Sequence, residues 1–170
     1  GGFYFTGQGN EMLIIRNKEI YDGALPSGNS VAALNLLRLA RMTGNVELEK
    51  RFDQLMRSFS SQVVAYPQAY THFMMVVDFM IGPGREIVIA GNPAHETTQA
   101  LIEVVRRAFL PNKVLLLHSC KEDEKKLSEF APFVEVLIPR DQHPVVYICE
   151  QFMCQVPIQD ISELKAVLIK

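Results

Sequence analysis

The sequence lacks a hydrophobic run long enough to cross a membrane, because no apolar stretch approaches the roughly 20 residues that a spanning helix needs. It also lacks an excess of charge: 17 basic and 19 acidic side chains nearly cancel, and no basic stripe carries interleaved aromatic residues. No basic segment followed by an apolar one marks a secretory signal. We therefore expect a cytoplasmic protein with no membrane and no nucleic acid among its partners.

Cysteine is scarce, and three cysteines do not form a disulfide framework in a chain of this size. Cys149 and Cys154 would point to opposite faces of an unbroken strand, so a bond between them requires a turn. Buried or free thiols, a redox or disulfide pair, and a metal site completed by Cys120, His118 or His143 all remain open. Zinc sites usually use two such cysteine pairs and the chain has one, so we expect no metal and no cofactor.

Nucleotide-binding and hydrolase motifs are missing as well. Neither G-x-G-x-x-G nor G-x-x-x-x-G-K-[ST] occurs, and no G-x-S-x-G elbow presents a serine nucleophile. Gly91-Asn92-Pro93 is therefore expected to be an ordinary turn between a strand and a helix. The residues alone define no reaction, and whether the chain is an enzyme stays open.

The most informative stretch that is present is a polar turn followed at once by an apolar helix, at residues 21–39. A helix this apolar must be surrounded by protein, so the turn is expected at the mouth of an enclosed space. Tyr21, Asp22, Ser27 and Asn29 offer the donors and acceptors that would hold a sugar or polyol there. The same residue types also suit a tight loop before a helix, and both interpretations remain open.

The chain changes character at Gly82-Pro83-Gly84, which no regular element can cross. Before this break the sequence predicts a hairpin at the N-terminus and then three helices. The hairpin strands are expected at residues 1–6 and 12–16, and the helices at residues 30–43, 45–63 and 68–81.

After the break, largely apolar runs at residues 86–90 and 114–117 flank a helical pattern at 94–109, which is typical of a right-handed βαβ unit. A helix at 121–130 and strands at 134–138 and 145–149 are expected to follow. Asp160 and Glu163 form a capping box for a last helix. The predicted fold is mixed α/β, with three helices followed by a small, mostly parallel sheet with flanking helices. We expect domains at residues 1–82 and 83–170.

Three motifs resemble those of the YyaL family, in the order Gly1–Phe5, Asp22–Ser30 with Asn35–Leu39, and Tyr147–Gln155. The resemblance covers essentially the whole chain and points to the C-terminal part of that family. It implies a thioredoxin-like domain joined to an α/α toroid of the six-hairpin glycosidase type, with a small α/β region at the end. Residues 1–82 would then supply the last toroid helices, and residues 83–170 the α/β region.

The resemblance also implies that Asp22, Ser27 and Asn29 face the centre of the toroid, where related enzymes bind sugars. Leu25 stands where some relatives have Glu, which removes a candidate acid and argues against glycoside hydrolysis. We expect the longer protein to bind or process a carbohydrate-like small molecule, while this fragment alone is inactive.

The alternative is a non-catalytic structural module that serves the thioredoxin-like domain, with Cys149 and Cys154 as redox partners. In either case helices 30–43 and 68–81 are too apolar to face water, so we expect the isolated chain to form a homodimer through them.

Overall fold

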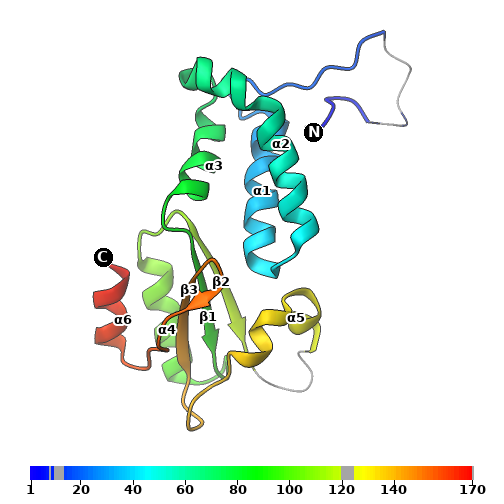
Figure 1. The fold of residues 1–170 in the computed structure, drawn as a ribbon. Coiled ribbons are helices and arrows are strands. Elements are labelled where there is room, and N and C mark those ends of the chain that lie inside the picture. Colours follow the sequence, from blue (N-terminus) through cyan, green and yellow to red (C-terminus); the bar gives the residue numbers. More distant parts are fainter. Residues whose placement is uncertain (8, 10–13, 120–124, 170) are drawn as a thin grey trace. The chain divides into compact units, whose positions relative to one another are not determined.

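The computed structural model describes residues 1–7, 9, 14–119 and 125–169 (Figure 1). Two compact units make up the chain. Unit 1 comprises Gly1–Ala40 and Asn45–Ile81, and unit 2 comprises Arg41–Gly44 and Gly82–Lys170. Among the described residues, helices and a four-stranded sheet are both present, so the fold is mixed α/β as predicted.

Unit 1 is helical, because its apolar residues recur at three- and four-residue steps. Its elements are α1 (Gly28–Thr43), whose last three residues belong to unit 2, α2 (Val46–Ala65), the short 3₁₀ helix η1 (Pro67–Ala69) and α3 (Thr71–Ile81). Asn45 caps α2, since its side chain accepts hydrogen bonds from the backbone N–H groups of Glu47 and Leu48. The largest buried side chains of the unit come from α2 and α3 and include Phe52, Leu55, Phe59, Phe73 and Phe79.

The N-terminal hairpin predicted at residues 1–6 and 12–16 does not form among the described residues, which contain no strand before β1 (Arg85–Ala90). Residues 10–13 lie outside the described part. A backbone hydrogen bond from the Phe5 N–H to the Asn17 carbonyl joins residues 1–6 to the described segment that begins at residue 14. The backbone of Phe3 is bonded instead to the side chain of Asn29, so it is not available for a strand ladder.

Unit 2 contains the sheet, whose strand order is β2-β1-β3-β4. Its strands are β1, β2 (Lys113–His118), β3 (Val145–Glu150) and β4 (Met153–Cys154). Its helices are α4 (Glu96–Arg107), α5 (Lys125–Phe130), the 3₁₀ helix η3 (Pro132–Val136) and α6 (Ile161–Leu168). The predicted βαβ unit is present, because β1 and β2 are parallel and α4 connects them.

Two details of unit 2 differ from the prediction. The sheet is mixed rather than mostly parallel, since β3 is antiparallel to both β1 and β4. The strand expected at 134–138 is instead the 3₁₀ helix η3 and the residues after it. Pro132 begins that helix, and its three-residue turn buries both Val134 and Leu137 against the same core.

The two faces of the sheet carry separate cores. Ile87 and Ile89 of β1 contribute to the core that includes residues of α4 and α6. Val88 and Ala90 contribute to the opposite core, together with Cys149 of β3. Strand residues alternate between faces, so Glu86 lies on the same face as Val88, and its side chain is 1% exposed.

Candidate functional site

The polar turn before α1 is held together by the buried carboxylate of Asp22. Its Oδ1 accepts a hydrogen bond from the Ser27 N–H at 2.8 Å. Its Oδ2 accepts from the N–H groups of His72 and Phe73 at 2.9 and 3.0 Å. Because these two groups are in the first turn of α3, the carboxylate satisfies donors that the helix itself leaves free. Asp22 therefore joins the turn to a helix that begins about fifty residues later.

Asn29 is 4% exposed and makes three hydrogen bonds with backbone groups. Its Oδ1 accepts from the Phe3 N–H, and its Nδ2 donates to the carbonyls of Phe3 and Glu19. Ser27 accepts from the N–H of Ser30 and donates to the Ser30 hydroxyl, which caps the start of α1. The polar side chains that the sequence singled out are thus brought together, but as connections between backbone segments.

Two groups beside this network remain available. The Tyr21 side chain is 66% exposed. The Nε2 atom of His72 is buried and has no hydrogen-bond partner among the described residues. Because buried polar atoms are normally paired, this imidazole nitrogen is the feature of unit 1 that calls for an explanation.

The second candidate site is the hairpin formed by β3 and β4. Cys149 pairs with Cys154 across the two strands, and a disulfide joins them with an S–S distance of 2.01 Å. The turn that the sequence requires for this bond is Gln151-Phe152, where both residues have positive φ, 51° and 63°. This is the backbone of a tight two-residue hairpin turn. Cys149 is fully buried in the core, whereas Cys154 is exposed.

Glu86 lies beside this disulfide. It is directly opposite Cys149 in the pairing of β1 with β3. Its Oε2 accepts a hydrogen bond from the Phe152 N–H at 3.0 Å, and its Oε1 is 3.5 Å from Nη1 of Arg41. Burial raises the pKa of the Glu86 carboxyl above its ordinary value, and the Phe152 N–H and the Arg41 guanidinium offset part of that effect.

Sequence reasoning missed Glu86. The signal was present, since Glu86 is the one acidic residue in the otherwise apolar run Glu-Ile-Val-Ile-Ala that was predicted as a buried strand. A charged side chain in such a strand requires a partner. The partners come from residues far away in the sequence, which no local pattern reveals.

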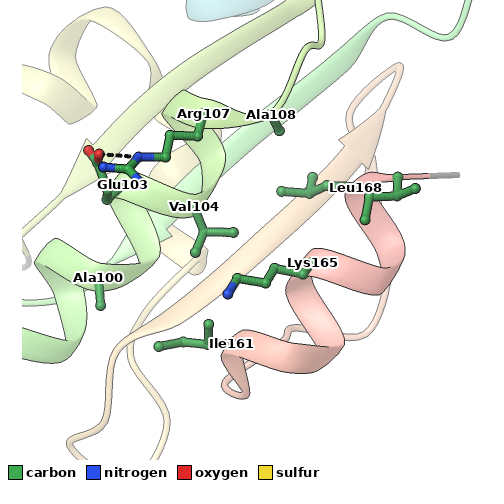
Figure 2. A pocket seen from close by; sticks show the side chains of 9 residues that line it. Ala100, Glu103, Val104, Arg107, Ala108, Ile161, Lys165 and Leu168 are labelled. Atoms are coloured by element: carbon green, nitrogen blue, oxygen red, sulfur yellow. Dashed lines mark hydrogen bonds and ion pairs between the residues drawn. The ribbon is translucent and has the colours of Figure 1, made fainter.

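A groove of about 530 Å³ lies between α4 and α6 in unit 2 (Figure 2). The walls are mostly apolar, and small residues at Ala100 and Ala108 leave the space open. Lys165 extends from α6 into the gap, and Glu103 and Arg107 form an ion pair at 2.6 Å on α4. None of the residues predicted as functional lines this groove.

In the described part of the chain, no three His, Cys, Asp or Glu side chains gather in a way that could hold a metal ion. His118, named as a candidate ligand, has its Nδ1 atom 3.0 Å from the Leu137 carbonyl. Cys120 lies outside the described residues. None of the described helices has the length and apolar character needed to span a bilayer.

Curated relatives match the full length of the chain. Spermatogenesis-associated protein 20 from human is 34% identical over 99% of the chain, and the rat protein is 35% identical over the same share. The chain matches the C-terminal part of that family. An uncharacterized protein of Caenorhabditis elegans is 27% identical over the same share. The chain spans only 21% to 23% of the length of these relatives.

No family model matches the chain, and no solved structure matches it closely. The names of these relatives state no reaction and no ligand.

Proposed function

We propose that this chain serves a longer protein as a non-catalytic structural module that undergoes thiol–disulfide exchange at the β3–β4 hairpin. The observation that carries the proposal is the asymmetry of the disulfide: Cys154 is exposed and Cys149 is fully buried. A thiolate from outside can reach the Cys154 sulfur, and the Cys149 sulfur then leaves into the core. The proposed partner is the thioredoxin-like domain that the family resemblance implies.

The geometry of unit 1 supports a structural role for the rest of the chain. Asp22 and Asn29 together make six hydrogen bonds with backbone groups, as described above. A carboxylate or amide that is occupied in this way must break existing bonds before it can contact a ligand. Ser27 is likewise occupied by Ser30.

A matched pair of variants tests the exchange proposal. In Cys149→Ser the exposed Cys154 stays free, and its thiolate should attack the disulfide of the oxidised thioredoxin-like domain, either in the full-length protein or in a separately added copy. One sulfur of that disulfide leaves as a thiolate and the other forms the mixed disulfide with Cys154. In Cys154→Ser the remaining Cys149 is buried and should form none. Non-reducing electrophoresis followed by peptide mass spectrometry measures both. Equal capture by the two variants, or capture by neither, would contradict the proposal.

A second proposal is that the longer protein binds a carbohydrate-like small molecule near residues 21–30. It is favoured by the exposed phenol of Tyr21, which can bond a hydroxyl group, and by the buried Nε2 of His72, which has no hydrogen-bond partner among the described residues and would gain one from a ligand that reached it. In this proposal Asp22, Ser27 and Asn29 stabilise the loop and do not contact the sugar. The other walls of the binding pocket come from segments of the longer protein outside these 170 residues.

Thermal unfolding of the full-length protein against a panel of sugars tests this second proposal. A ligand should raise the midpoint, and the rise should be lost in Tyr21→Phe and His72→Phe. Tyr66→Phe, which changes another exposed tyrosine of unit 1, is the matched control and should keep the rise. If no sugar shifts the midpoint, the carbohydrate proposal is wrong.

Self-association of the isolated chain is a further part of the proposal. Apolar side chains on α1 and α3 are exposed, and they include Val31, Leu39, Met75 and Ile81. Surfaces of this kind are normally covered, so a second copy would bury them when the rest of the protein is absent. Sedimentation velocity should find a dimer that is weakened in Met75→Glu. A monomer at all accessible concentrations would contradict this.

A further inference from the structure

We propose that Glu86 supplies the proton that Cys149 receives when the hairpin disulfide opens. This inference rests on the proposed exchange function and assigns the acid for it. The observation behind it is the arrangement of three neighbouring strands around one buried carboxyl: Glu86 on β1, Cys149 opposite it on β3, and Cys154 on β4.

The register brings the carboxyl and the buried sulfur to the same face of the sheet. Side chains directly opposite each other on antiparallel strands have Cβ atoms about 5 Å apart, which is within reach of a glutamate side chain. The Glu86 carboxyl also extends to the turn between the cysteines, where it accepts the Phe152 N–H. Glu86 therefore touches the loop that the disulfide closes.

The chemistry of the buried sulfur requires such a group. When a dithiol opens the disulfide, one of its thiolates attacks the exposed Cys154 sulfur and the S–S bond breaks. The bonding electron pair goes to Cys149, whose thiolate would then be a charge in an apolar core. Burying an unpaired charge is costly, so a proton must reach the sulfur. Glu86 donates it and becomes a carboxylate.

The remaining steps balance the exchange. The second thiol of the dithiol loses its proton to solvent and attacks its own mixed disulfide, and Cys154 leaves and takes a proton from solvent. The dithiol is oxidised to a disulfide, and Cys149 and Cys154 are reduced to thiols. Glu86 recovers its proton from solvent through the exposed side of the hairpin.

The charged groups around Glu86 suit both of its protonation states. Burial raises the pKa of its carboxyl, which keeps it protonated at higher pH than an exposed glutamate, and Glu150 on β3 acts in the same direction. Arg41 and the Phe152 N–H favour the carboxylate that remains after donation. Arg85 lies 3.9 Å from the Glu150 carboxylate and reduces the influence of that charge.

Reduction of the 170-residue chain by dithiothreitol between pH 5 and 9 tests the inference, with each rate divided by the concentration of the dithiothreitol thiolate. In the wild type this normalised rate should be highest at low pH and should fall as Glu86 ionises. In Glu86→Gln it should be independent of pH and about tenfold lower at the acidic end, since the amide donates no proton. Glu150→Gln removes an exposed carboxylate of the same hairpin and should keep the pH dependence, with the fall displaced toward lower pH because Glu150 helps to raise the pKa of Glu86.

The outcomes separate this inference from the exchange function. A wild-type disulfide that dithiothreitol does not open would contradict both the exchange function and the role of Glu86. A disulfide that opens with a normalised rate independent of pH would overturn the role of Glu86 and leave the exchange function standing. If Glu150→Gln lowered the normalised rate at acidic pH as much as Glu86→Gln does, the role of Glu86 would also be overturned. The wild-type profile decides the matter even if Glu86→Gln does not fold.

Discussion

Two turns of this molecule are each built against a buried carboxylate, and the two carboxylates are bonded differently. Asp22 accepts three backbone N–H groups at 2.8 to 3.0 Å. Glu86 accepts one, from Phe152, and has Arg41 at 3.5 Å. A carboxylate with three short bonds from fixed backbone donors is fixed in position as part of the fold. One with fewer bonds, set beside a breakable S–S bond, keeps the capacity to exchange a proton.

The largest effect is expected from removing Asp22. Asp22→Ala leaves the N–H groups of Ser27, His72 and Phe73 without an acceptor and should destabilise unit 1 by about 4 kcal/mol. Hydrogen exchange measures this directly, because those three amides should lose protection together. Asp53→Ala, on the exposed face of α2, is the control and should change little. Unchanged protection in Asp22→Ala would mean that the bonds to α3 do not hold the turn.

Breaking the disulfide should have the next largest effect. Cys154→Ser removes a cross-link that closes a short loop and should lower the free energy of unfolding by about 2 kcal/mol. Urea unfolding in the absence of reductant measures the loss. In excess dithiothreitol the variant and the wild type should unfold alike, because both then lack the bond. A difference that persists under reduction would point to packing of the sulfur instead.

Glu86 should make stability depend on pH in a direction opposite to that of a salt-bridged acid. Its folded pKa is raised above the ordinary value of 4.5 by burial, so the folded state holds the proton more firmly than the unfolded state. The stabilisation is complete below the unfolded pKa and is lost as pH rises through the folded pKa. Subtracting the urea-unfolding curve of Glu86→Gln from that of the wild type at each pH isolates this contribution. A contribution that grows with pH would contradict the assignment.

The smallest effect concerns the hairpin turn itself. Gln151 has φ of 51°, a region that asparagine tolerates better than glutamine. Gln151→Asn should therefore stabilise the hairpin by about 0.5 kcal/mol, measured by thermal unfolding. Gln155→Asn, just beyond the hairpin, should be neutral. A destabilised Gln151→Asn would show that the Gln151 side chain contributes more than the turn geometry predicts.

Much of the fold follows from local patterns in the sequence. Apolar spacing predicted α2 and α4 because each helix buries one face, and the Asn45 and Asp160 caps were visible because their donors are two or three residues away. The antiparallel direction of β3 was not predictable, since an apolar strand has the same composition in either direction. Residues 134–138 are mostly apolar and include three β-branched side chains, which favours a strand, and packing against the core instead places residues 134–136 in the 3₁₀ helix η3.

The candidate sites divide in the same way. The sequence placed Asp22, Ser27 and Asn29 in one turn, and that turn exists. It did not show that the first turn of α3 and the Phe3 backbone occupy their polar atoms. Likewise the need for a turn between Cys149 and Cys154 was evident from their spacing, while the buried acid beside them was not.

Apart from the N-terminal hairpin and residues 134–138, the sequence by itself determined the helices, the strands and the turns, because each depends on residues within a few positions of one another. Only the tertiary structure decided which polar groups are occupied and which are free. Glu86, the buried neighbour of Cys149, lies on a strand more than sixty residues earlier in the sequence. The influence of its carboxyl on the cysteine depends on their distance in space and on the exclusion of water, which the order of the residues does not reveal.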